Sequence, residues 1–142
     1  MPKVRDILAR KGNVVRTIAP SASVLEATRE MNEHRIGALL VAHGDRIIGV
    51  FTERDVLTRI VAAAADPASI KVQDVMTSPV AYCTPETNLE ECKGIFTEKR
   101  IRHLPVMEGE KVVGVVTPGD VLAFEADDQV RTIHYLKEYI TS

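Results

Sequence analysis

Two short segments of the sequence carry the residue types best suited to holding a small polar ligand. Each begins with a threonine and ends three positions later with an aspartate: Thr52 with Asp55, and Thr117 with Asp120. A carboxylate accepts hydrogen bonds from both hydroxyls of a ribose diol, and the neighbouring threonine hydroxyl can hold an adjacent oxygen. The two segments are therefore candidates for two ribose-binding corners.

Each of these corners follows an apolar, β-branched run and opens a helical pattern, so each aspartate is expected in the first turn of a helix. The free N–H groups and the positive dipole end of a helix favour an anion. A nucleotide phosphate would turn away from the aspartate toward a cation, and Arg54 is the nearest one. Threonine and aspartate are also common helix caps that need no ligand, so both roles stay open here.

The segment around each corner is one copy of an internal repeat. Sliding the chain by 65 positions places Gly49 on Gly114 as well as each threonine and aspartate on its counterpart. There are 15 identities over the 43 positions 15–57, where average composition would supply about three. The sequence Val-Arg-Asp-Ile at 4–7 also recurs as Val-Gln-Asp-Val at 72–75. The chain is therefore a tandem of two similar units.

The apolar periodicity changes in the same order within both copies. In the first, a β-branched run at 14–18 precedes a helical pattern capped by Ser23, with Val24, Ala27 and Met31 facing inward. Two apolar runs separated by a glycine turn then predict a hairpin, and a last helix follows. The second copy repeats this order, with Asn88 as the cap and Leu89, Cys92 and Phe96 inward. Each unit is thus expected to be β-α-β-β-α, in an α/β (α+β) fold with the two repeats packed as a pseudo-twofold pair.

The boundaries follow from this repeat. We place the first repeat at 1–66, a connector at 67–71, the second repeat at 72–126 and an amphipathic C-terminal helix at 127–142, all within one module. Two roles fit the terminal helix, covering the module's own core or self-association. The glycines Gly49 and Gly114 lie inside predicted strands, where a glycine indicates either close approach of backbone or ligand or a β-bulge.

The composition excludes several classes of function. With 18 basic and 20 acidic residues in 142 and a net charge of −2, the chain lacks the basic surface that nucleic acid requires. No run approaches the length of a membrane span, so we expect a cytoplasmic protein. Cys83 and Cys92 lack the spacing of a zinc or redox motif and are interpreted as small core residues. The four histidines lack metal-ligand spacing, and no glycine-rich phosphate loop is present, so neither a metal site nor an enzyme is predicted.

The pattern Gly-Val-x-Thr-x-x-Asp, found twice after a β-α-β-β unit, together with Arg-His-Leu-Pro-Val at 102–106, resembles the cystathionine-β-synthase (CBS) domain pair, or Bateman module. The resemblance extends from Val4 to about Phe124. It implies a stand-alone module with two clefts that bind AMP, ADP, ATP, an NAD-type or an S-adenosyl compound as a regulatory ligand, with no cofactor required. It also implies a homodimer and a separate, unknown protein target.

The resemblance also implies roles for individual residues. The ribose would bind Thr52 and Asp55 in one cleft and Thr117 and Asp120 in the other. The residues expected around the adenine are Thr17, Ile18 and Pro20 in the first copy and Ala81, Tyr82 and Pro85 in the second. The cations expected near the phosphate are Arg54, Arg102 and His103, although His103 also fits a core position or a pH-sensitive group.

The two clefts are not expected to be equivalent. Leu40 stands where the second copy has Pro105, and Arg54 where it has Gly119. We predict an adenine-nucleotide sensor that responds by a small change in the packing of its units. A ligand-free dimerisation or assembly module is the alternative, and an unrecognised enzyme is a further one.

Overall fold

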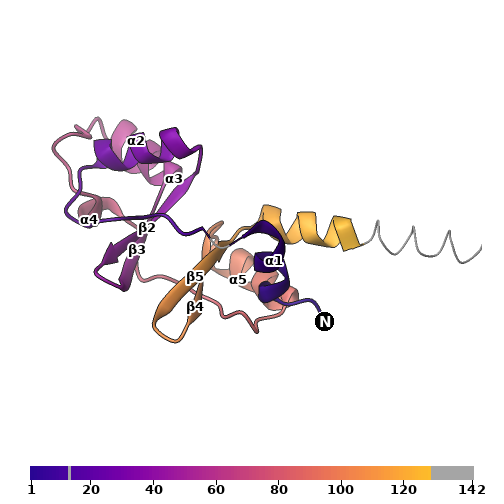
Figure 1. The fold of residues 1–142 in the computed structure, drawn as a ribbon. Coiled ribbons are helices and arrows are strands. Elements are labelled where there is room, and N and C mark those ends of the chain that lie inside the picture. The colour runs from indigo at the N-terminus through magenta and orange to yellow at the C-terminus, as the bar shows by residue number, and fades with distance from the viewer. Residues whose placement is uncertain (13, 129–142) are drawn as a thin grey trace, which may run out of the picture. The chain divides into compact units, whose positions relative to one another are not determined.

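The computed structural model describes residues 1–12 and 14–128, which form an α+β fold of two compact units (Figure 1). Among the described residues, unit 1 comprises 1–12, 82–107 and 113–128. Unit 2 comprises 14–81 with 108–112. The compact units thus cut across the repeats of the sequence, because the segment that opens the first repeat belongs to the unit that holds most of the second.

Unit 2 is built around a three-stranded sheet of order β1-β2-β3, in which β2 pairs parallel with β1 and antiparallel with β3. The helix α2 precedes the hairpin and the helical segments α3 and η1 follow it. The elements are β1 (Thr17–Ile18), α2 (Val24–His34), β2 (Ala38–His43), β3 (Arg46–Thr52), α3 (Glu53–Asp55), the π-helix η1 (Val56–Val61) and α4 (Val72–Val75). The predicted β-α-β-β-α order of the first repeat is confirmed.

Unit 1 contains the N-terminal helix, which lies beside α5 and the helix at 118–128 (Figure 1). Its elements are α1 (Val4–Lys11), α5 (Leu89–Lys99), most of β4 (Leu104–Glu108) and of β5 (Lys111–Val116), and the helical residues 118–128. The strands β4 and β5 form a two-stranded sheet whose turn contains Gly109 at φ 65°. The turn predicted at this glycine is confirmed, as is its counterpart at Gly44, where φ is 62°.

The prediction of a first strand in the second repeat is wrong, because the structure has only an isolated bridge there. In the first repeat β1 pairs Thr17 with Leu40, whose N–H donates to the Arg16 carbonyl at 3.2 Å. Pro105 stands at the corresponding place in the second repeat and has no N–H to donate. Pairing there is reduced to one parallel bridge, between Cys83 and Val106.

The caps and inward faces of the two long helices are confirmed. The Ser23 hydroxyl accepts from the Glu26 N–H at 3.1 Å, and the Asn88 side chain accepts from the Glu91 N–H at 2.8 Å. These bonds satisfy backbone donors that the first turn of a helix leaves unpaired. The six residues predicted to face inward are all buried: Val24, Ala27, Met31, Leu89, Cys92 and Phe96.

Both cysteines are free and buried, as predicted. A hydrogen bond with Cys92, together with burial, raises the pKa of the Cys83 thiol. The predicted C-terminal helix falls largely on residues 129–142, outside the described residues. In the described part of the chain no helix has the length and apolar character needed to cross a membrane.

The two strand glycines accommodate side chains from the segments that open the repeats. A Cβ on Gly114 would lie 2.6 Å from Cδ2 of Leu8, and one on Gly49 would overlap Sδ of Met76 and lie 2.9 Å from its Cγ. Leu8 and Met76 each follow the repeated four-residue motif directly. The segment that opens each repeat therefore packs on the sheet of the other one. The bulge alternative also holds at Gly49, because the β2–β3 register shifts beside it, between Val41 and Ala42.

We predict that Gly49→Ala lowers the free energy of unfolding by about 1–3 kcal/mol, because the added methyl group overpacks the contact with Met76. Urea denaturation measures the change, and Met76→Ala in the same background should recover part of it. Gly94→Ala is the matched control, because no atom lies within 4 Å of a Cβ at this α5 position. The control should be stabilised by up to about 1 kcal/mol. An unchanged midpoint for Gly49→Ala would contradict the packing argument.

Candidate functional site

Both strand-to-helix corners are closed by reciprocal hydrogen bonds between the threonine and the aspartate. At the first corner the Thr52 N–H donates to Asp55 Oδ2 at 3.0 Å, and the Asp55 N–H donates to Thr52 Oγ1 at 3.2 Å. At the second corner the Thr117 N–H donates to Asp120 Oδ2 at 2.9 Å, and the return bond is 3.1 Å. Each pair is a capping box of identical pattern. The capping role is therefore shown for all four residues.

At the first corner the carboxylate is buried among hydroxyl donors. The Thr52 hydroxyl lies 3.1 Å from Asp55 Oδ2, and the Thr77 hydroxyl donates to Asp55 Oδ1 at 3.2 Å. Arg59 Nε lies 3.7 Å from the same Oδ1, and the side chain of Asp55 is 8% exposed. This carboxylate thus binds a hydroxyl within the chain, and a ribose hydroxyl would have to take the place of Thr77.

At the second corner a lysine, rather than a threonine hydroxyl, donates to the carboxylate from the opening segment. The Lys11 ammonium donates to Asp120 Oδ2 at 2.7 Å and to the Val115 carbonyl at 2.9 Å. The Asp120 side chain is 22% exposed, against 8% for Asp55. The two corners thus differ in the donors that contact the carboxylate, which are Thr77 and Arg59 at Asp55 and Lys11 at Asp120. Asp120 is the more accessible of the two carboxylates.

The remaining predicted site residues do not all gather at the corners. Thr17 and Ile18 lie on β1, which β2 separates from the strand that ends at Thr52. Arg54 and Arg102 are exposed, and His103 is half-buried just before β4. The other residues expected near the adenine are Pro20 and Ala81 in unit 2, and Tyr82 and Pro85 in unit 1.

Three contacts of the carboxylates were not predicted from the sequence: those of Arg59, Thr77 and Lys11. Arg59 follows Asp55 by one helical turn, so helical spacing alone could have revealed it. Thr77 and Lys11 come from the segments that open the repeats, and the pairing of those segments with the opposite sheet leaves no local signal in the sequence.

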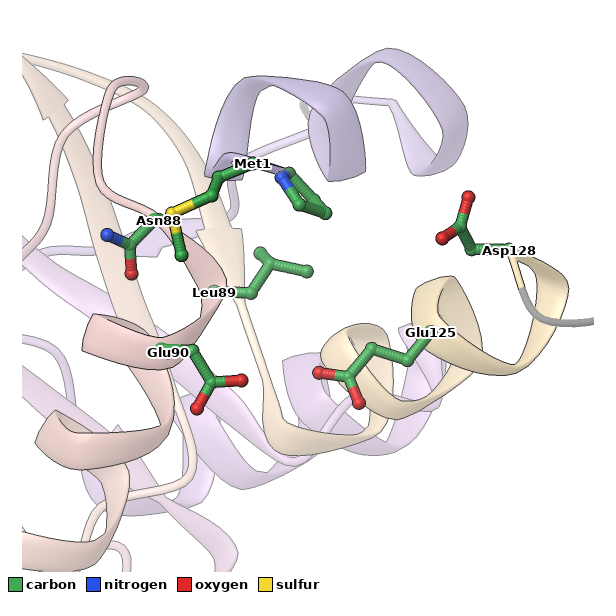
Figure 2. A pocket seen from close by; sticks show the side chains of 7 residues that line it. Met1, Asn88, Leu89, Glu90, Glu125 and Asp128 are labelled. Carbon is green, nitrogen blue, oxygen red and sulfur yellow. The ribbon is translucent and has the colours of Figure 1, made fainter. Parts of the chain in front are cut away.

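The threonines and aspartates of the corners do not line either of two surface hollows found within the units, although Glu53 lines one of them. One, of about 290 Å³, is lined by Met1, Pro2, Asn88, Leu89, Glu90, Glu125 and Asp128 (Figure 2). Lys93 pairs with Glu90 and Glu125, and hydrogen bonds with Glu125 and then Glu90 raise the pKa of Lys93. Three carboxylates around this hollow disfavour a phosphate.

The second hollow, of about 490 Å³, lies in unit 2 and is lined by Thr28, Met31, Asn32, Arg35, Ile36, Gly37, Glu53 and Val56. Arg35 ends α2 in the left-handed conformation at φ 52°, and Arg100 ends α5 likewise at φ 55°. The two arginines thus occupy equivalent places in the repeats, where the left-handed conformation terminates a helix.

One group of side chains in the described part of the chain could hold a metal ion, and the spacing of the histidines in the sequence did not predict it. Glu30, Glu33 and His34 on α2 place one ligand atom each within 4.8 Å of one another. The His34 ring already lies 3.1 Å from a Glu30 oxygen and 3.4 Å from Nη1 of Arg16. A guanidinium beside the ring nitrogen disfavours a second cation at the same atom.

A model described as "CBS domain" matches residues 4–62 and 72–127. The chain belongs to the CBS domain family. The resemblance seen in the repeated corner motif is thereby confirmed.

Individual CBS domain proteins show the same relationship. The chain is 33% identical over 123 residues to the mitochondrial CBS domain-containing protein CBSX3 of Arabidopsis thaliana, covering 83% of this chain and 60% of that protein. It spans 57% of a relative from Methanopyrus kandleri. The chain thus covers less than two thirds of these curated relatives.

Solved structures of CBS proteins match over most of their length. A protein with CBS domains from Burkholderia ambifaria has a TM-score of 0.86 and 37% identity, covering 89% of this chain and 96% of that one. CBSX2, solved in complex with AMP, has a TM-score of 0.73 and 25% identity, covering 92% of this chain and 99% of that one. The α+β fold is therefore that of CBS domain proteins.

We predict that Asp55→Ala and Asp120→Ala destabilise the protein unequally, because the two carboxylates differ in burial. Asp55→Ala removes a buried cap together with its hydrogen bonds from the Thr52 N–H and the Thr77 hydroxyl, so it should cost about 2–3 kcal/mol. Asp120→Ala removes a cap whose side chain is 22% exposed and should cost about 1 kcal/mol. Urea denaturation of both variants measures the loss in free energy of unfolding. Equal losses would contradict the argument that the more buried carboxylate contributes more to stability.

Proposed function

We propose that this chain is a regulatory module that binds an adenine nucleotide and signals to a separate protein partner in the cytoplasm by a change of conformation. The ligand is AMP, ADP, ATP, an NAD-type or an S-adenosyl compound. The observation that carries the proposal is the pair of corner aspartates, each set by a capping box so that its carboxylate meets a donor from another part of the chain. A carboxylate held in this way accepts the two hydroxyls of a ribose.

The CBS family supports this reading, because one structurally similar member, CBSX2, was solved with AMP. Asp120 is the better ribose acceptor of the two, since its side chain is 22% exposed. We assign Arg54, Arg102 and His103 to the phosphate by charge, and the residues predicted around the base to the adenine. Thr52 and Thr117 act by positioning their aspartates.

A ligand-free assembly module remains the second candidate, and one observation favours it. Leu57 and Leu122 occupy equivalent positions of the two repeats, and both are largely exposed, as is Val61. Exposed large apolar side chains at matching places suit a protein interface. We propose a homodimer with or without a bound nucleotide, because the exposed leucines proposed for self-association are not among the residues proposed for ligand binding.

Titration of the purified chain with AMP, ADP, ATP, NAD and S-adenosylmethionine tests the function. A ligand bound only by the folded state at about 100 times its Kd should raise stability by about 2.7 kcal/mol. Thermal denaturation and calorimetry give the shift and the stoichiometry. Asp120→Asn should weaken binding at one site at least about tenfold, while Asp45→Asn, in an exposed turn, should not.

Two outcomes would count against the sensor. No thermal shift at millimolar concentrations of any of these ligands would favour assembly, and equal binding by Asp120→Asn and wild type would reject the ribose role of Asp120. Sedimentation of Leu57→Lys and Leu122→Lys tests the alternative. These variants should become monomeric if the exposed leucines form the interface.

A further inference from the structure

We propose that Lys11 makes the corner at Asp120 selective for a ligand that carries a phosphate. The inference rests on the proposed nucleotide binding and adds the residue that recognises the anionic part of the ligand at this corner. Lys11 is the last residue of α1, far in sequence from the corner, and it lies outside the motif that predicted the site.

The position of the ammonium carries the inference. Lys11 Nζ donates to Asp120 Oδ2 at 2.7 Å and to the Val115 carbonyl at 2.9 Å. An ammonium has three N–H donors, so one of them is left over after these two bonds. The side chain is 38% exposed, which leaves it within reach of a ligand at the carboxylate. A positive charge therefore stands directly beside the proposed ribose acceptor.

The end of α1 is held in place independently of this lysine. The guanidinium of Arg10 lies over the Phe124 ring, 4.4 Å from its centre, and also pairs with Asp127. Both partners belong to the helix at 118–128, which begins at the corner. Leu8 adds its contact with Gly114. Lys11 can therefore shift its side chain between partners without releasing the helix that carries it.

Ribose binding changes the electrostatics of this lysine. Where a sugar hydroxyl takes Oδ2 of Asp120, it competes with Lys11 for that oxygen. An ammonium that loses this contact is best compensated by a new anion close by. A phosphate on the bound nucleoside supplies that anion, and a neutral nucleoside does not. The corner is thus expected to discriminate between AMP and adenosine.

The first corner lacks an equivalent cation from its opening segment. Leu8 corresponds to Met76 in the repeat, so position 11 corresponds to Pro79. The cation beside Asp55 is Arg59 of the corner's own helix, at 3.7 Å, and the second corner has Phe124 at that position. The effect of Lys11 should therefore be confined to one site.

The test compares AMP with adenosine by calorimetry on the wild-type chain, Lys11→Met and Lys11→Arg. Lys11→Met should lower the affinity for AMP at one site at least about tenfold and change the affinity for adenosine less than about twofold. Lys11→Arg keeps the charge and should recover part of the AMP affinity. Raising the salt concentration should weaken AMP binding more in the wild type than in Lys11→Met.

Lys99→Met is the matched control, because Lys99 is also the last residue of a helix in the same unit and is exposed. It should bind AMP as the wild type does. Unchanged AMP affinity in Lys11→Met overturns the proposal. An equal loss for AMP and adenosine also overturns it, since that result identifies a purely structural role. If the wild type binds neither compound, the proposed nucleotide function itself fails, so the two failures are distinguishable.

Discussion

The reciprocal hydrogen bonds between a threonine and the aspartate three residues later are the constraint on which both corners depend. They end a strand, begin a helix and fix the carboxylate in one orientation. The carboxylate can therefore accept a further donor without any rearrangement of the backbone. In the first corner that donor is Thr77, and in the second it is Lys11. The same local chemistry thus stabilises the start of each helix and presents a carboxylate that binds a donor from elsewhere in the chain.

The surroundings of each corner aspartate depend on the segment that opens the other repeat, because each opening segment packs on the opposite repeat's sheet. The segment at 4–11 packs on the sheet of the second repeat, and the one at 72–77 packs on the sheet of the first. Gly49 and Gly114 allow this close approach, because a larger residue would overlap Met76 or Leu8. The glycines of the corner motif therefore have a packing role in each repeat. The identity of the opening segment then gives one corner a hydroxyl and the other an ammonium.

The two repeats are consequently similar in backbone and different in chemistry. Asp55 is buried and bonded to hydroxyls, whereas Asp120 is more exposed and paired with a cation. Pro105 removes a strand pairing that the first repeat has, so the second sheet keeps two strands and a bridge. The two corners therefore differ both in exposure and in the donor that contacts the carboxylate.

The sequence by itself determined the repeat, the caps at Ser23 and Asn88, the hairpin turns and the corner motif, because these depend on residues within a few positions of one another. It also identified the family from that motif. Only the tertiary structure decided which opening segment meets which corner, and hence the roles of Lys11 and Thr77. The physical reason is that both opening segments have the same pattern, so local periodicity cannot distinguish their partners. The packing of distant side chains makes that choice.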